Sequence, residues 1–394
     1  MFSFCSVSAQ WNWLEKASLP DDGRESTGYF VIGTDLYVVC GRTSISPYVQ
    51  INELWKYNSL TDTWAQKADF PGGTRTSPLA FAVDGKGYVM GGGYPEMHVD
   101  CWQYDPLTDT WTQKNDFPGN GRYTAAHFVL GSKVYMVGGY FNGTQTNEVW
   151  VYNSLTDNWS QLNDFPGGNV QAATGFRLGT DGYIVAGVTG HSNYVALKKA
   201  WRYSADYDVW DTIPSFPGAA RLGAVSFKKD GKAYVGLGAS AVFETHYNDF
   251  YGYDPVLNVW VPGTPLTAEG RRQGLGVNIG DRVFVGTGAN GPWEDEPNTT
   301  YFNDLYTIDS PVGIKEAATA STQMRVLNTL VTDNLQVNLP ADGEVILSGL
   351  SGQILWRGTL GAGNSVIPLQ GISNGCYIVS GPEFSSHQRI IVAR

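Results

Sequence analysis

The strongest constraint on this 394-residue chain is a phrase that it repeats. The stretch YNSLTDTWAQKADFPGG begins at Tyr57, and close copies begin at Tyr104 and Tyr152. Six tryptophans mark equivalent points at spacings of 51, 47, 48, 51 and 50 residues: Trp13, Trp64, Trp111, Trp159, Trp210 and Trp260. A period near fifty residues is typical of propellers and solenoids, whose units cannot bury their hydrophobic faces alone. The sequence therefore predicts six structurally equivalent units.

Each unit has the pattern of four short strands joined by tight turns. An aromatic-led apolar run closes on a glycine in every unit: Gly41, Gly92, Gly139, Gly187, Gly238 and Gly288. In the third unit we expect strands near 123–130, 134–139, 147–152 and 159–162. Asp-Gly pairs at Asp84 and Asp230 supply the positive backbone dihedrals of two-residue hairpins. No long helical period competes, so the pattern predicts an all-β fold.

These residues resemble the kelch repeats, which combine a paired glycine, a tyrosine and a tryptophan in a four-stranded blade. The resemblance implies a six-bladed kelch β-propeller over residues 10–314, with aromatic layers between neighbouring sheets. The paired glycine is complete only in the second and third units. The sixth unit lacks a tryptophan strand, while WLEKASLP from Trp13 aligns with WAQKADFP from Trp64. We therefore expect the N-terminal strand to complete blade 6 and remove two open sheet edges.

Composition and the N-terminus indicate a secreted protein. The formal net charge is −11, from 37 acidic and 26 basic side chains, which argues against a nucleic-acid partner. Residues 1–9 look like the remnant of a signal peptide cleaved after Ala9, although the basic start of such a peptide is missing. An ordinary N-terminal segment is the alternative. We expect buried thiols at Cys40, Cys101 and Cys376, and no run is long enough to span a membrane as a helix.

The chain changes character after the repeats. Residues 315–325 form a polar linker, and residues 326–394 alternate like a small β-sandwich. This segment resembles the C-terminal sorting domain of the type IX secretion system through LSGLSGQILWRG, IPLQGISNGCYIV and the basic end RIIVAR. The Pro-Asn-Pro turn that usually opens that domain is absent. The resemblance implies export to the outside or surface of a Gram-negative bacterium by that machinery, and an immunoglobulin-like accessory domain is the alternative.

An arginine recurs four residues after the proline that ends most repeats. The members of this arginine column are Arg24, Arg75, Arg122, Arg221 and Arg271, with Val170 in the remaining unit. Such a column could tie neighbouring blades together, because a guanidinium has five donors. It could instead ring the channel entrance and bind an anion, because planar bidentate donors suit carboxylate or sulfate.

The loop after the blade glycine offers a second set of candidates. In kelch proteins this loop and the arginine position lie on one face, which often binds ligand. The candidates in this loop are Arg42, Tyr94, Tyr140, Phe141 and Trp293. Aromatic side chains beside arginines suit an acidic glycan or a protein hot spot. The resulting candidate site contains Arg24, Arg42, Arg75, Arg122, Arg221, Arg271, Tyr94, Tyr140 and Trp293.

Signals for catalysis are weak. His98, His191 and His246 lie in loops after blade glycines, but three unrelated surface histidines are the simpler interpretation than a metal site. The acidic loop 294–296 lacks the spacing of an ordered calcium loop. We expect no metal and no cofactor.

The sequence thus predicts a monomeric, secreted or cell-surface propeller that binds a glycan or protein ligand. The alternative is a carbohydrate-active kelch enzyme, such as a sialic acid mutarotase or epimerase, or an oxidase. The acid and base residues of those enzymes cannot be placed on definite positions of this chain, so the alternative rests on analogy of fold.

Overall fold

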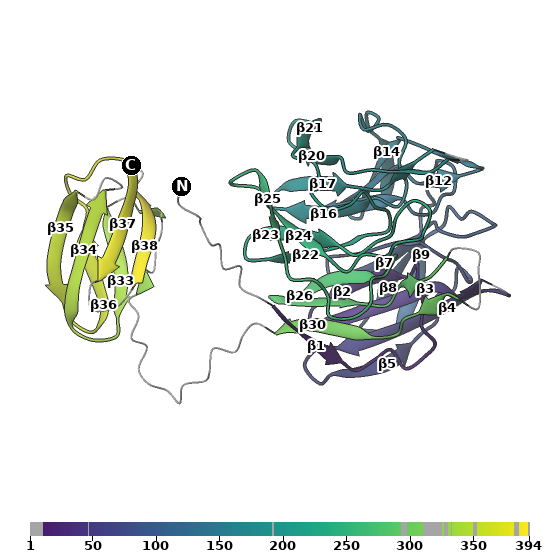
Figure 1. The fold of residues 1–394 in the computed structure, drawn as a ribbon, viewed down its shortest axis with the longest axis horizontal. Coiled ribbons are helices and arrows are strands. Elements are labelled where there is room, and N and C mark those ends of the chain that lie inside the picture. Colours follow the sequence, from purple (N-terminus) through teal and green to yellow (C-terminus); the bar gives the residue numbers. More distant parts are fainter. Residues whose placement is uncertain are drawn as a thin grey trace. The chain divides into compact units, whose positions relative to one another are not determined.

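The chain divides into two compact units, Met1–Ser310 and Pro311–Arg394. The structure, a computed structural model, describes residues 11–45, 47–190, 193–292, 298–309, 325–326, 330–331, 333–349, 353–381 and 386–392. Every regular element among them is a β-strand (Figure 1). The described residues therefore include no helix long and apolar enough to cross a membrane.

Six four-stranded antiparallel sheets make up the first unit. The strands are given in hydrogen-bonded order. The first sheet contains β2 (Gly28–Ile32), β3 (Asp35–Ile45), β4 (Tyr48–Asn58) and β5 (Thr63–Lys67), and the second contains β6 (Leu79–Val83), β7 (Lys86–Met90), β8 (Cys101–Asp105) and β9 (Thr110–Lys114). The third contains β10 (Ala126–Leu130), β11 (Lys133–Val137), β14 (Val149–Asn153) and β15 (Asn158–Gln161). The fourth sheet contains β16 (Thr174–Leu178), β17 (Asp181–Val185), β20 (Ala200–Ser204) and β21 (Val209–Ile213), and the fifth contains β22 (Val225–Lys229), β23 (Lys232–Gly236), β24 (Phe250–Asp254) and β25 (Val259–Pro262). The sixth contains β26 (Leu275–Ile279), β27 (Arg282–Gly286), β30 (Leu305–Asp309) and β1 (Asn12–Lys16).

Turn chemistry produces these short strands. Asp84 and Gly85 both have positive φ, 51° and 73°, as a two-residue Asp-Gly hairpin requires, and the turn at Asp230 has the same form. Three small hairpins within the loops were not anticipated from the sequence. They are β12 (Tyr140–Phe141) with β13 (Thr144–Gln145), β18 (Val188–Thr189) with β19 (Val195–Ala196), and β28 (Ala289–Asn290) with β29 (Thr300–Tyr301).

The last sheet of the first unit takes its outer strand from the other end of the chain. β1 pairs antiparallel with β30, which places Trp13 opposite Ile308 (Figure 1). Trp13 is buried against Phe227 and Phe250 of the preceding sheet. The pairing thus joins the first strand to the last repeat and covers the open edge of β30.

The repeated phrase builds a contact between neighbouring sheets, which we call the rim latch. In the second sheet the Tyr104 hydroxyl donates to Asp109 at 2.7 Å, and Asp109 also accepts the N–H of Ala68 from the previous sheet at 3.0 Å. Trp111 in turn donates its Nε1–H to the carbonyl of Ala68 at 2.9 Å. At the first sheet the same latch reaches Ala17, directly after β1. The repeated Tyr, Asp and Trp are therefore used to hold sheet to sheet.

A ring of left-handed residues surrounds the axis of the first unit. The members, each two positions after the arginine column, are Ser26, Ser77, Thr124, Ala172, Gly223 and Gln273, with φ between 47° and 61°. The backbone N–H groups of five members, all except Thr124, donate to the carbonyl of the preceding member, as from Ser26 to Gln273 at 3.0 Å and from Ser77 to Ser26 at 2.7 Å. We call this the axial ring, and it connects the first and last repeats directly.

The second unit contains two sheets around its own core. The sheets are β31 (Arg325–Val326), β33 (Asn334–Leu339), β36 (Gly363–Pro368); and β32 (Leu330–Val331), β38 (Ser386–Val392), β37 (Gly375–Gly381), β34 (Gly343–Gly349), β35 (Ile354–Leu360). Alternate residues such as Leu335, Val337 and Leu339 point into that core, as the alternating sequence indicates.

Some expectations fall outside the described residues. They include the signal-peptide remnant 1–9 and nearly all of the expected linker 315–325, of which only Arg325 is described. Among the cysteines, Cys40 and Cys101 are buried free thiols, as predicted. The side chain of Cys376 lies outside the described part.

Candidate functional site

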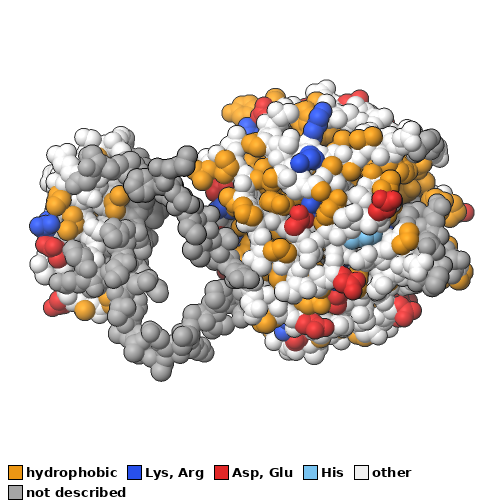
Figure 2. Space-filling model, in the orientation of Figure 1, with side chains coloured by type: hydrophobic (Ala, Val, Ile, Leu, Met, Phe, Trp, Pro, Cys, Tyr) orange, Lys and Arg blue, Asp and Glu red, His pale blue; other side chains and the backbone are white. Residues whose placement is uncertain are grey.

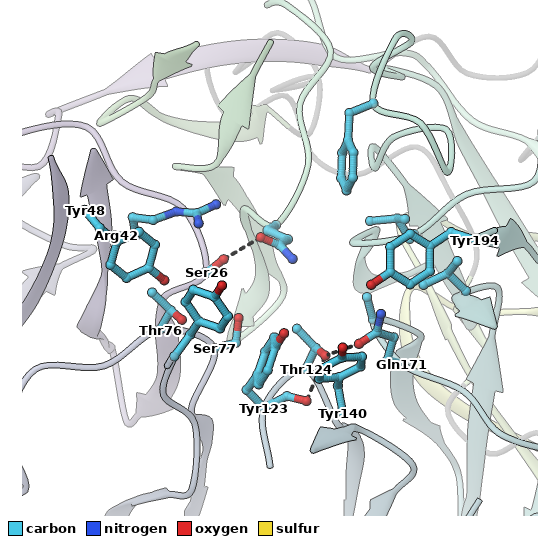
Figure 3. Close-up of a pocket in the computed structure, with 16 residues that line it drawn as sticks. Ser26, Arg42, Tyr48, Thr76, Ser77, Tyr123, Thr124, Tyr140, Gln171 and Tyr194 are labelled. Atoms are coloured by element: carbon cyan, nitrogen blue, oxygen red, sulfur yellow. Dashed lines mark hydrogen bonds between the residues drawn. The ribbon is translucent and has the colours of Figure 1, made fainter. Parts of the chain in front are cut away.

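A cavity of about 230 Å³ opens at the axis of the first unit, on the side of the loops that follow the blade glycines. Figure 3 shows tyrosines, hydroxyls and Arg42 around one shared space. The lining residues are Ser26, Arg42, Tyr48, Thr76, Ser77, Tyr94, Tyr123, Thr124, Tyr140, Gln171, Ala172, Val188, Tyr194, Leu222, Phe243 and Gln273. Members of the axial ring form its floor, so the cavity lies where all six repeats meet.

Five tyrosines form an arc along one wall of this cavity. Tyr48 and Tyr94 have ring centroids 5.6 Å apart, Tyr94 and Tyr123 6.3 Å, and Tyr123 and Tyr140 5.4 Å. Burial, followed by the charges of Tyr140 and Tyr194, raises the pKa of Tyr123. Burial and its contact with Tyr194 also raise the pKa of Tyr140. Both phenols are therefore protonated at neutral pH and can donate hydrogen bonds into the cavity.

A buried charge network adjoins the tyrosine arc at Tyr48, whose ring centroid lies 5.5 Å from the guanidinium carbon of Arg42. Glu25 forms an ion pair with Arg42, and its Oε2 lies 3.0 Å from the Nε of Arg272. All three side chains are almost completely buried. Burial works to lower the pKa of Arg42, but the attraction and hydrogen bond of Glu25 outweigh it and raise that pKa. Among the described residues, one carboxylate thus serves two guanidinium groups.

His246 adds a neutral partner to this network. Its Nε2 lies 2.8 Å from Nη1 of Arg272, which also donates to the carbonyl of Gly291 at 2.6 Å. Burial, together with the nearby Arg272 charge, lowers the pKa of His246 to about 4. The imidazole is therefore uncharged at neutral pH.

The arginine column lies beside the cavity but does not line it. Each of its members is buried and forms an ion pair with a carboxylate: Arg24 with Asp21 and Glu53, Arg75 with Asp100, Arg122 with Glu148, Arg221 with Asp249, and Arg271 with Asp304. Arg75 also donates to the carbonyl of Gly91 at 3.0 Å and stacks over Phe70. These contacts favour the structural interpretation of the column, because every guanidinium already has its own counter-ion and carbonyl partners.

Some of the loop candidates line the cavity, and one lies outside the described residues. Arg42, Tyr94 and Tyr140 all line the cavity, whereas Trp293 lies outside the described residues. Phe141 lies over the guanidinium of Arg122, 5.6 Å from its centre, and is not among the lining residues.

Several lining residues were missed by sequence reasoning. Tyr123 and Gln171 occupy the position directly after the arginine column, where Glu25 and Arg272 also fall in their own repeats. This position carries a different residue type in every repeat: Glu25, Thr76, Tyr123, Gln171, Leu222 and Arg272. This variation within an otherwise regular repeat could have identified the position from the sequence, because the geometry of the axial ring requires no particular side chain there.

The three loop histidines do not gather in the described part. His98 packs near Gly93, His246 binds Arg272, and His191 falls outside the description. No group of three or more His, Cys, Asp or Glu side chains suited to a metal occurs among the described residues. The acidic loop 294–296 also falls outside them.

A second, narrower cavity of about 140 Å³ lies on the other side of the axial ring. It shares Ser26, Ser77 and Thr124 with the first cavity, and the innermost strands supply Tyr29, His127 and Ser226. Ser26 donates to the side chain of Gln273, its neighbour in the ring. The axial ring therefore separates the upper, tyrosine-lined cavity from a lower channel.

Comparison with known proteins supports the fold. A model of the Kelch motif matches residues 121–166. Among solved structures the chain resembles YjhT with a TM-score of 0.58 and 17% identity, covering 66% of this chain and 89% of that one. No curated protein matches the sequence. The first unit therefore has a kelch-type propeller fold, and at this identity the likeness extends to the fold alone.

Proposed function

We propose that the first unit is a six-bladed kelch propeller that binds an anionic ligand in the tyrosine-lined cavity. Each four-stranded sheet is one blade, and β1 completes the sixth. The ligand is an acidic glycan or an acidic segment of a protein, with its negative group directed toward Arg42.

The observation that carries this proposal is the position of Arg42, which lines the same cavity as the five tyrosines. Its guanidinium belongs to a buried network with Glu25 and Arg272, which holds the side chain in place at the cavity wall. A guanidinium held there offers charge-assisted hydrogen bonds to an anion in the cavity. The tyrosine arc then offers stacking faces and phenol donors to the rest of the ligand.

The lining favours binding over acid–base catalysis. Among the described residues that line the cavity, none is Asp, Glu or His. A proton-transfer enzyme needs an acid or base within hydrogen-bond reach of the reacting atom, with a pKa near the working pH. The phenols with raised pKa hold their protons too firmly at neutral pH to act as bases.

A screen of acidic and neutral glycans and of acidic peptides on the full chain tests this function. We expect acidic members of one class to bind, with affinity that falls as salt increases, because the contact with Arg42 is partly electrostatic. Tyr140→Ala should weaken binding of the best hit, and Tyr207→Ala, at an exposed turn outside the cavity, is the matched control. Preference for neutral ligands, or equal loss in both variants, would contradict the proposal.

The carbohydrate-active enzyme of the mutarotase, epimerase or oxidase kind gives a different outcome. Incubating the hit with the protein and following its anomeric and stereochemical composition by NMR separates the two. Release of an unchanged ligand supports the binding module, whereas accelerated interconversion or oxidation identifies an enzyme.

We further propose that the protein is exported and that the second unit serves as its sorting domain. The support is the resemblance of residues 326–394 together with a self-contained core, which includes Leu335, Val345 and Ile390. Removing 326–394 should leave a folded propeller inside a type IX-secreting cell, because the first unit has separate cores. Appearance of the shortened protein outside such a cell would reduce the second unit to an accessory domain.

A further inference from the structure

The lower channel ends in a tier of six equivalent side chains, one from each innermost strand. The tier contains Val31, Ala82, Val129, Arg177, Lys228 and Asn278 at the fourth position of β2, β6, β10, β16, β22 and β26. Side chains alternate along a strand, so these residues share the channel side with Tyr29, His127 and Ser226 two positions earlier. We call this end of the channel the lower mouth. The neighbouring strands β16 and β22 each place a cation there, and the other four strands place uncharged side chains there.

Arg177 and Lys228 lie close enough to repel each other. Lys228 is an exposed side chain, but partial desolvation at the mouth, followed by the positive charge of Arg177, lowers its pKa. Neither side chain takes part in any ion pair of the described residues, although most other basic side chains of the first unit do. The nearby turns hold Asp84, which lines a cavity with Arg177, and Asp230, which pairs with Lys229 at 3.9 Å.

The backbone at this mouth is braced rather than loose. Asn278 accepts the N–H of Lys228 through Oδ1 at 2.7 Å and donates its Nδ2–H to the carbonyl of Lys228 at 2.7 Å. Ser226 donates to the carbonyl of Gly175 at 3.4 Å, which joins β22 to β16. The two cations thus project from strands that are tied to each other. Arg177 lines a cavity with His127, Ser226 and Asp84, whereas Lys228 lines a separate cavity with Asp230 and Asp281.

We propose that the lower mouth is a second anion site, which takes a tetrahedral oxyanion, sulfate or phosphate, between Arg177 and Lys228. A guanidinium presents a planar fork and an ammonium presents three rotatable donors, so together they surround an oxyanion from two sides. The bound anion removes the repulsion between the two cations. The site is independent of the tyrosine-lined cavity, because the axial ring lies between them.

Titration of the full chain with inorganic sulfate and with inorganic phosphate at low ionic strength tests this site. Calorimetry gives the affinity, and NMR signals of the Arg177 Nε–H group and of nearby amides give the location. We expect saturable binding, and Arg177→Gln with Lys228→Gln together should weaken it at least about tenfold. Both side chains are exposed, so the double variant should melt like the parent. Lys229→Gln is the matched control, because Lys229 is paired with Asp230.

Two further arms separate the possible outcomes. A sulfated oligosaccharide that binds more tightly than sulfate in the parent, but not in the double variant, shows that the site takes the group as part of a glycan; equal affinities show a site for the free anion. The proposal is overturned if the parent shows no saturable binding at millimolar anion, or if the double variant binds as the parent does. Loss of sulfate binding in Arg42→Gln alone would also overturn it, because the anion would then occupy the upper cavity.

Discussion

Two sets of buried arginines surround the same axis and are used differently. In the arginine column each guanidinium has its own carboxylate. In Arg75, for example, Nη1 lies 2.6 Å from Oδ1 of Asp100. Arg42 and Arg272 fall outside the column and share Glu25. The first set occurs at a repeated position, and each of its guanidinium groups pairs with a carboxylate of the same repeat. The second set occurs where the repeats differ, and its two guanidinium groups pair with the same carboxylate.

The difference shows how a symmetric ring acquires an asymmetric site. The tyrosine bond of the rim latch recurs in the first five sheets, with Asn258 in place of the aspartate in the fifth, and it holds neighbouring sheets together as the axial ring does. The side chain directly after the column takes no part in these contacts and varies from repeat to repeat. Figure 2 shows acidic, basic and hydrophobic side chains scattered over the drawn face of the first unit. Departures from the repeat therefore mark the site better than the repeat itself.

The largest expected effect is on stability and comes from removing one arginine of the column. Arg75→Ala should lower the free energy of unfolding by about 3 to 5 kcal/mol, because it leaves the half-buried Asp100 without its partner. Burial alone works to raise the pKa of Asp100, but its bonds with Arg75 hold that pKa below the usual range. Chemical denaturation measures the change. Arg202→Ala, which breaks an exposed pair with Asp211, should cost no more than about 1 kcal/mol.

The next effect concerns ligand affinity. Arg42→Gln should weaken binding of an anionic ligand by about 1.5 to 3 kcal/mol, because a charge-assisted contact is lost. Its stability should fall less than that of Arg75→Ala, since Glu25 keeps Arg272. Calorimetric titration beside a thermal melt compares the two. The contrast between the two sets fails if Arg42→Gln melts as low as Arg75→Ala and binds as the parent does.

A pH dependence of stability follows from His246. Its pKa is lowered from 6.5 to about 4, so the folded state disfavours protonation that the unfolded chain accepts. The stability gained from the neutral imidazole is complete above pH 6.5 and is lost as pH falls toward 4. With allowance for solvent screening the loss is of order 1 to 2 kcal/mol. Denaturation of parent and His246→Gln across this window should show a smaller slope in the variant, and identical slopes would contradict the assignment.

The smallest effect belongs to the aromatic arc. Tyr94→Ala should weaken ligand binding by about 1 kcal/mol, because Tyr94 is half exposed and offers one stacking face. This loss should change little between low and high salt, whereas the loss in Arg42→Gln should shrink with salt. Titrations at two ionic strengths give both values. A Tyr94 effect that disappears in salt would mean that the arc acts through charge.

Much of the fold could be predicted from local patterns. The strands around Tyr135 and Trp159 follow from the alternation, the turns and the repeat, and they occur where the spacing places them. The three small hairpins could not be predicted, because two-residue strands such as Tyr140–Phe141 have no periodicity of their own. Of the residues proposed for the site, Arg42, Tyr94 and Tyr140 line the cavity, and their role in binding a ligand stays a prediction. Tyr48, Tyr123 and Tyr194 also line it but were not proposed, because the repeat pattern requires no tyrosine at those positions.

By itself, the sequence determined that the chain contains six similar repeats with aromatic residues between neighbouring sheets, because these features depend on contacts within a repeat or between adjacent copies. Only the tertiary structure decided which arginines share a carboxylate. Glu25 and Arg272 are 247 residues apart and meet because the first and last repeats are neighbours around the axis. A local sequence pattern cannot reveal a contact over that separation. The pairing of Glu25 with both Arg42 and Arg272 is therefore a property of the closed ring.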